Sequence, residues 1–267
     1  MASWCIWFAD HHRRGVIVDL GGRTDGVLLT AHLDTIGAVV KSIKPTAAEN
    51  LAGWGLVLEN VEAENCRVIT RFDGVYSGTL QLNEPSSHVN LGLAEAKRTV
   101  DTMEVVLDEK TYSREDTLKL GVCNGDFIYF DPRTVVTASG YIKSRYLDDK
   151  ICAALLLGFA KYLKDNKLVP HRKIWAHFTV YEEVGHGACA SVPYDVTEVL
   201  SVDMACVGGG LDGDECKVSI CAKDSGGPYN YDIITRLVQI AREKNLNYAV
   251  DVYPSYGSMR RRQSPQI

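Results

Sequence analysis

Short apolar runs bounded by glycine mark the first part of the chain. GVIVDLGG occupies 15–22 and GVLLTAHLD occupies 26–34. Apolar runs of this length between turn residues are typical of buried strands. The pattern therefore predicts two buried strands that follow each other closely along the chain.

The pattern changes between residues 44 and 139. Several runs of β-type residues, each followed by turn residues, show little helical period, and one stretch, SSHVNLGLAEAKRTVD, fits either a loop or a helix. The strand-like runs are GLVLEN, CRVITRFD, VYSGTLQL, MEVVLDE and DFIYFDP. A succession of short strands separated by turns predicts a small all-β inserted domain over 44–139.

Helical and strand-like runs alternate after residue 140. The helical period predicts a helix over 150–166, capped by Asp148 or Asp149. Its apolar stripe is expected to contain Ile151, Leu155, Phe159 and Tyr162. Further helices are expected over 185–192 and 229–244, and further strands over 173–181, 198–204, 217–222 and 247–254.

Alternating strands and helices place parallel strands in one sheet, because each helix carries the chain back across it. The sequence therefore predicts an α/β fold, with a mostly parallel sheet flanked by helices and interrupted by the all-β insert. Residues 1–43 and 140–267 would form one discontinuous domain around residues 44–139.

Composition and charge narrow the class of protein. The 267 residues are 46% apolar and 24% charged, which is ordinary for a globular chain and unlike a disordered one. Lys and Arg number 29 against 34 Asp and Glu, and this acidic balance argues against nucleic-acid binding, which needs basic surface. The longest strongly apolar run, 151–160, is too short to span a bilayer.

The cysteines point to a reducing compartment. The eight cysteines include no C-x-x-C pair, and the opening MASWCIWFAD lacks the basic segment that starts a secretory signal. Most of them lie in apolar runs, where a free cysteine behaves as a small hydrophobic residue. We expect reduced thiols in a cytoplasmic protein.

Candidate chemistry begins at the end of the second predicted strand. His32 and Asp34 share one face of a strand, so Asp34 can bind one ring nitrogen and leave the other for a metal ion. A buried histidine satisfied by a neighbouring carboxylate is the alternative. Asp148 and Asp149 fit either a carboxylate bridge between two metal ions or a helix cap with an acidic first turn.

Further acids follow two later strands. On a regular strand Glu182 and Glu183 would point to opposite faces, but a strand that ends here lets both reach one site. One could then bind a metal ion while the other moves protons, and a solvated strand end is the alternative. Asp203 ends another apolar strand and fits either a metal ligand or a turn acid.

One imidazole and several carboxylates near element ends make a mixed nitrogen and oxygen ligand set. Such a set suits zinc, cobalt or manganese better than calcium, and the cysteines lack the spacing of a structural zinc site. The sequence therefore favours a two-metal hydrolytic centre.

A family resemblance rests on four segments: LLTAHLDTIGAVV (28–40), SRYLDDKICAALLL (144–157), FTVYEEVGHGACA (178–190) and VLSVDMACVGG (199–209). In this order they resemble the M42 family of metallo-aminopeptidases, the group of glutamyl, deblocking and tetrahedral aminopeptidases. Some members have carried an endoglucanase label. NEPSSHV at 83–89 and the β insert are also similar to that family.

The resemblance implies a role for each candidate residue. Glu182 looks like the general base, Asp34 like the residue that orients a histidine ligand, and Asp149 like the residue that follows the bridging carboxylate. Two divalent metal ions are implied, zinc or cobalt first and manganese second. Their implied ligands, with Asp148 as the bridge, are His32, Asp148, Glu183 and Asp203.

The resemblance also implies a reaction and partners. The reaction is hydrolysis of the first peptide bond of a peptide with a free amino terminus. The insert resembles the PDZ-like dimerisation domain of the family, which implies homo-oligomers from dimers to dodecamers. Neither a nucleic acid nor a membrane is an expected partner.

Both ends of the sequence depart from the family. The family has a further histidine ligand near its C-terminus, whereas this sequence has no histidine after His186 and closes on the basic tail MRRRQSPQI. Members of the family usually continue here with Asp-Ala and small residues. Deletion of a single base from codons for Asp-Ala-Ser-Ala-Ala would give Met-Arg-Arg-Arg, so the tail suggests a frameshift that removed the last ligand and the closing strands and helices. The start, MASWCIWFA, also looks short. A chain that lacks one metal ligand is expected to have little or no activity.

Two other functions stay open. A non-catalytic protein could keep the fold and use the β insert for assembly or peptide binding. An endoglucanase-like hydrolase is suggested by the old label and by the Glu182–Glu183 pair. Metal content separates the first alternative from a peptidase, and sensitivity to chelators separates the second.

Overall fold

The computed structural model describes most of the chain, namely residues 6–7, 15–46, 49–53, 55–187 and 192–255. Several residues noted in the sequence lie outside the described residues: Trp4, Phe8, Cys5, Cys189 and the tail MRRRQSPQI. The chain divides into two compact units, one of Met1–Asp34 with Tyr146–Ile267 and one of Thr35–Arg145. Each unit is described by itself below.

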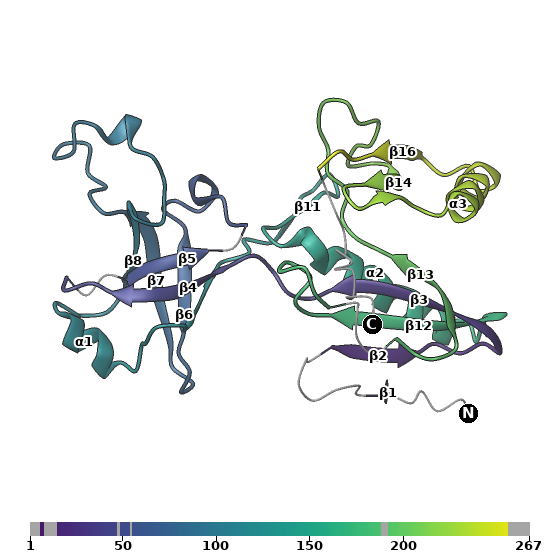
Figure 1. Cartoon of the computed structure of the whole chain (residues 1–267), viewed down its shortest axis with the longest axis horizontal. Helices are drawn as coiled ribbons and strands as arrows, with labels where there is room; N and C mark the ends of the chain where they lie inside the picture. Colours follow the sequence, from purple (N-terminus) through teal and green to yellow (C-terminus); the bar gives the residue numbers. More distant parts are fainter. Residues whose placement is uncertain (1–5, 8–14, 47–48, 54, 188–191, 256–267) are drawn as a thin grey trace, which may run out of the picture. The chain divides into compact units, whose positions relative to one another are not determined.

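The first unit contains a five-stranded sheet with the order β1-β2-β12-β3-β13 (Figure 1). β3 lies between β12 and β13 and is parallel to both, while β2 is antiparallel to β12. The link from β2 to β3 is too short for the crossover that parallel strands need, so the sheet mixes both directions. The strands are β1 (Ile6–Trp7), β2 (Val16–Asp19), β3 (Thr24–His32), β12 (Arg172–Thr179) and β13 (Val196–Ser201).

Helix α2 (Leu147–Asp165) packs its apolar side chains against this sheet. The stripe predicted from the sequence is wrong at two positions, because Leu155 and Tyr162 are 60% and 57% exposed. Two apolar rows run along the helix, and only one can face the sheet. The row that does so begins with small residues, which allow close approach, and its buried members are Cys152, Ala153, Leu156 and Leu163.

A second, three-stranded sheet has the order β15-β14-β16, made of β14 (Val218–Asp224), β15 (Gly227–Pro228) and β16 (Tyr248–Val252). Helix α3 (Tyr231–Glu243) starts where the Asn230 side chain accepts hydrogen bonds from two backbone N–H groups. The buried Asp251 accepts hydrogen bonds from the backbone of Asp212 and from the Ser219 hydroxyl. This carboxylate therefore fixes the long loop that follows β13.

The second unit contains a closed antiparallel barrel with the order β4-β5-β8-β7-β6-β9. Side chains alternate between its interior and solvent, as in β6, where Cys66 and Val68 are buried and their neighbours are exposed. Phe130, Leu80 and Met103 are fully buried inside it. The strands are β4 (Ala38–Ile43), β5 (Glu49–Gly53), β6 (Asn65–Ile69), β7 (Val75–Leu82), β8 (Met103–Leu107) and β9 (Phe127–Phe130).

Short elements complete the second unit, and two of them answer questions left by the sequence. GLVLEN, predicted as a strand, forms the 3-10 turn η1 (Leu58–Asn60) instead, because Leu58 points into the barrel core. SSHVNLGLAEAKRTVD is mostly loop and contains η2 (Leu93–Glu95). The others are α1 (Arg114–Lys119), β10 (Val135–Val136) and β11 (Ile142–Lys143).

The helix predicted over 185–192 is absent at the residues of this range that the structure describes, namely 185–187 and 192. Gly185 and Gly187 have φ values of 78° and 103° there, which no right-handed helix contains. The rest of the predicted helix, apart from Val192, lies outside the described residues.

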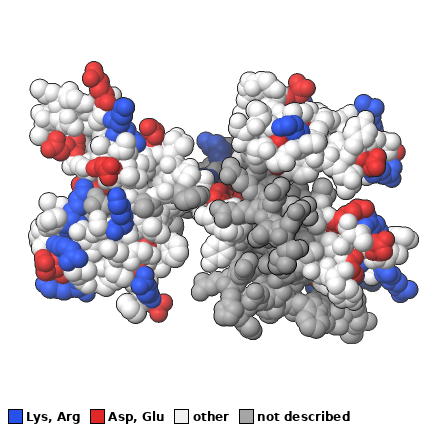
Figure 2. Space-filling model, viewed as in Figure 1, with Lys and Arg blue, Asp and Glu red and all other residues white. Residues whose placement is uncertain are grey.

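Charged side chains of both signs are interspersed over the described residues on the face shown in Figure 2. Ion pairs in the described part of the chain include Arg98 with Glu62 at 2.8 Å and Arg172 with Glu198 at 2.7 Å. Exposed pairs of this kind contribute little to stability. In the part of the chain that the structure describes, no helix combines the length and apolarity needed to cross a membrane.

Truncation of the barrel core is expected to destabilise the protein strongly. Phe130 is fully buried, so Phe130→Ala should lower the free energy of unfolding by about 3–5 kcal/mol in denaturant titrations. Phe72 is 78% exposed and provides the matched control. Phe72→Ala should change the free energy of unfolding by no more than about 0.5 kcal/mol. Equal effects of the two substitutions would contradict the barrel core.

The buried His177 of β12 is expected to make stability fall in acid. Burial lowers the pKa of His177 from 6.5 to about 4. Between these pH values His177 is protonated in the unfolded chain but neutral in the folded chain. The free energy of unfolding should therefore decrease as the pH drops from 6.5 towards 4, by up to about 3 kcal/mol. His177→Gln should show a flatter dependence in denaturant titrations across this range. Parallel curves for the two proteins would refute this assignment.

Candidate metal centre

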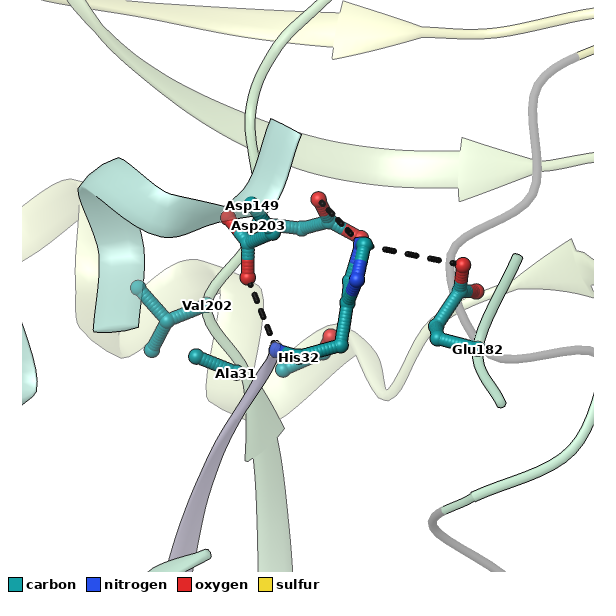
Figure 3. Close-up of a pocket in the computed structure, with 7 residues that line it drawn as sticks. Ala31, His32, Asp149, Glu182, Val202 and Asp203 are labelled. Atoms are coloured by element: carbon teal, nitrogen blue, oxygen red, sulfur yellow. Dashed lines mark hydrogen bonds and ion pairs between the residues drawn. The ribbon is translucent and has the colours of Figure 1, made fainter. Parts of the chain in front are cut away.

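The centre is built on His32, the last residue of β3. Its side chain is 3% exposed, and its Nε2 atom lies 2.9 Å from Asp148 Oδ1, 3.8 Å from Glu182 Oε2 and 4.0 Å from Asp203 Oδ1. Figure 3 shows the His32 ring lying between Glu182 and Asp203. The Nε2 edge of this imidazole therefore meets carboxylates that come from three other segments of the chain.

This edge is a strongly anionic environment. Burial disfavours a charge on His32, but the carboxylates of Asp148, Asp34, Asp203 and Glu182 outweigh it and raise the pKa of His32 to about 11. Carboxylates held this close repel one another unless a positive charge lies among them. The site is therefore one that stabilises a cation.

Asp34 supports both His32 and the segment after β12. The Asp34 carbonyl oxygen lies 3.1 Å from His32 Nδ1, and because a carbonyl can only accept, Nδ1 carries a proton. The Asp34 carboxylate lies 3.4 Å from the same nitrogen and accepts the Glu183 backbone N–H at 3.1 Å. Although burial opposes this, the contacts with His32 and the Glu183 N–H lower the pKa of Asp34. The other ring nitrogen, Nε2, is left to face Asp148.

Asp148 and Asp149 lie in the first turn of α2 and have non-helical backbone angles there. The peptide bond between them is cis. Asp149 is fully buried, and its carboxylate accepts the backbone N–H of His32 at 3.1 Å. Burial raises the pKa of Asp149 to about 7, although a hydrogen bond from the Cys152 thiol acts in the opposite direction and lowers this pKa. Asp148 thus faces the ring of His32, while Asp149 holds its backbone.

Glu182 and Glu183 belong to the turn that follows β12. The Glu182 side chain is 14% exposed and lines a small pocket with His32 and Asp203 (Figure 3). Burial and the negative charge of Asp148 raise the pKa of Glu183 to about 7. The Glu182 carboxylate thus lies at the cluster, while Glu183 is joined to it through its backbone N–H.

The structure groups only part of the predicted ligand set. His32, Asp148 and Asp203 each offer one atom, and these atoms lie within 4.8 Å of one another. A nitrogen and carboxylate oxygens at this spacing are suitable donors for a zinc-type ion. Glu183, predicted as a ligand of a second ion, is not in this group.

Two features of the centre were missed in the sequence. The Lys150 ammonium group donates a hydrogen bond to the Leu33 carbonyl and so ties α2 to the end of β3. The LDDK segment contained this signal, because it places a cation beside two acids. Tyr181 has a φ of 72°, and nothing in the sequence indicated it.

Comparisons with known proteins identify the family of this chain and agree with its fold. A model of the M42 glutamyl aminopeptidase family matches residues 15–260. The chain is 39% identical over 265 residues to the Bacillus subtilis protein YhfE, named as an aminopeptidase, and the match covers 97% of this chain and 75% of that protein. A lysyl aminopeptidase of Pyrococcus furiosus is 26% identical over 171 residues, which cover 64% of this chain and 47% of that enzyme.

Solved structures show the same fold. The TET1 peptidase of Pyrococcus horikoshii, described as assembling into a tetrahedron or a large octahedral shell, superimposes with a TM-score of 0.74 at 26% identity. That match covers 91% of this chain and 73% of the peptidase. A TET aminopeptidase of a marine sediment Thaumarchaeota archaeon gives a TM-score of 0.81 at 17% identity, over 96% of this chain and 73% of that one. On the family match and the YhfE relationship, the chain belongs to the M42 glutamyl aminopeptidase family and is a peptidase of that family.

Proposed function

We propose that this chain removes the N-terminal residue from peptides with a free amino terminus, using two divalent metal ions and a glutamate base. One observation carries the proposal. His32, Asp148 and Asp203 gather three ligand atoms within 4.8 Å, beside two glutamates, in a member of an aminopeptidase family.

The donor atoms fit the metal ions that the family implies. His32 Nε2, Asp148 and Asp203 would hold one ion, and Asp148 and Glu183 would hold a second. Zinc or cobalt suits one imidazole with several carboxylates, and manganese is the next candidate. When bound, such ions polarise the scissile carbonyl and lower the pKa of water.

Asp34 would keep His32 ready for this role. With the proton on Nδ1 directed at the Asp34 carbonyl, Nε2 presents its lone pair toward Asp148 and Asp203 once the ring is neutral. Partners of this kind fix both the tautomer and the orientation of a ligating ring. Asp149 would fix the backbone beneath it through the His32 N–H.

Glu182 would move the protons. Its Oε2 atom lies 3.8 Å from His32 Nε2 at the edge of the ligand cluster, and its side chain is largely buried. A carboxylate here can accept a proton from the attacking water and deliver it to the amine of the leaving peptide.

Assembly and location complete the proposal. The TET1 peptidase builds closed shells, and we infer that this chain also associates with copies of itself, with residues 35–145 as the dimerisation domain. The six described cysteines are free thiols, which suits the cytoplasm.

Metal analysis tests the centre. We expect about two equivalents of zinc or cobalt per chain, removal by a chelator, and recovery when the ion is returned. Asp203→Asn should weaken metal binding at least about 10-fold in calorimetric titrations, because it removes a charged ligand. Asp165→Asn, at the exposed end of α2, is the control and should bind like the parent chain. A chain that takes up no divalent metal ion would overturn the proposal.

Kinetics test the base. Because low turnover is expected, fluorogenic aminoacyl substrates are the appropriate assay. Glu182→Gln should lower kcat by roughly 100- to 10,000-fold with unchanged metal content, since it removes proton transfer and keeps the size of the side chain. Glu243→Gln, on the exposed part of α3, should leave kcat unchanged. Hydrolysis that resists a chelator, or that survives Glu182→Gln, would exclude this mechanism.

A further inference from the structure

Two consecutive residues contact the same cluster, Glu182 through its carboxylate and Glu183 through its backbone. Glu182 Oε2 lies 3.8 Å from His32 Nε2, and the Glu183 N–H donates to Asp34 Oδ2 at 3.1 Å. Strand β12 ends at Thr179, and a turn begins at Glu182. The backbone therefore changes direction between these two residues.

Tyr181 is where the direction changes. Its φ is 72°, in the left-handed region, which a bulky residue with a β-carbon seldom adopts. Gly185 and Gly187 also have positive φ, but both follow the glutamates and cannot set their direction. Among the described residues from 172 to 184, Tyr181 alone has this conformation.

The turn itself holds Tyr181 in place. The Tyr181 carbonyl accepts the His186 N–H at 2.8 Å, and the Glu182 carbonyl accepts the Gly185 N–H at 2.7 Å. Gly187 lies so close to the strand end that a β-carbon would come within 2.8 Å of the Val180 carbonyl. The Tyr181 side chain is 51% exposed, so burial of the ring does not explain its backbone.

We propose that Tyr181 is a positioning residue, whose left-handed backbone brings the Glu182 carboxylate to His32 and the Glu183 N–H to Asp34. The inference rests on the proposed function, because it concerns the glutamate proposed as the base. Unfavourable backbone conformations persist where the surrounding structure imposes them, and they gather at functional sites. Tolerance of positive φ, rather than the phenol group, is then the property that position 181 requires.

Substitutions that separate backbone preference from size test this inference. Asn adopts positive φ readily, whereas Val, which is similar in size, does not. Tyr181→Val should lower kcat roughly 100-fold with little change in KM, as expected when a reacting group is displaced. Tyr181→Asn and Tyr181→Gly should keep most of the parent kcat. Tyr194→Val is the matched control, since Tyr194 is fully exposed and has an ordinary φ, and it should have no effect.

A second readout does not depend on turnover. The visible absorption of bound Co²⁺ reports the ligands around it, so the Tyr181→Val spectrum should differ from that of the parent chain, and the Tyr181→Asn spectrum should match it. If Tyr181→Val does not fold, Tyr181→Ala against Tyr181→Asn makes the same comparison more mildly. Identical Co²⁺ spectra, or kcat values that follow side-chain size, would overturn the inference. Hydrolysis by the parent chain that persists after a chelator removes its metal ions would refute the proposed function, and the Co²⁺ spectra would still decide the role of Tyr181.

Discussion

Repulsion among carboxylates around one imidazole is the constraint on which the first unit depends. Acidic groups of Asp148, Glu182 and Asp203 lie within 4.0 Å of His32 Nε2, and the low exposure of Glu182 and Asp203 makes their negative charges costly. Only a positive charge makes the arrangement favourable. The sheet supplies the geometry, because the parallel strands β3, β12 and β13 all end at one edge, where such side chains can meet.

Backbone contacts then lock the strand ends together. Asp34 joins the end of β3 to the Glu183 N–H after β12, while Asp149 and Lys150 of α2 bind the backbone of His32 and Leu33. A displacement of one element would therefore move ligands from the others. The cluster is held by hydrogen bonds to polypeptide backbone, which depend less on side-chain rotamers than a set of surface ion pairs would.

Much of this could be predicted from the sequence, for physical reasons. The acids at strand ends could be placed from the apolar runs that precede them. Strand alternation does not explain the contact of Asp34 with His32, because β3 ends at His32 and Asp34 lies beyond it. The buried face of α2 could not be predicted, because two apolar rows compete and docking on the sheet selects the one with Cys152 and Ala153. The φ of Tyr181 is likewise imposed by contacts that close the turn, so it has no signature in the sequence.

Exceptions to local rules occur in both units, and several of them lie at the centre. The barrel strand β6 follows strand alternation, but neither β4 nor β5 was predicted from the sequence, and the 3-10 turn η1 was predicted as a strand. The first unit holds non-helical angles at Asp148 and Asp149, the positive φ of Tyr181 and unpartnered buried polar atoms of Thr30 and His177. A stable fold tolerates such departures only where other interactions compensate for them, and here the compensation comes from hydrogen bonds that converge on His32 and Asp34.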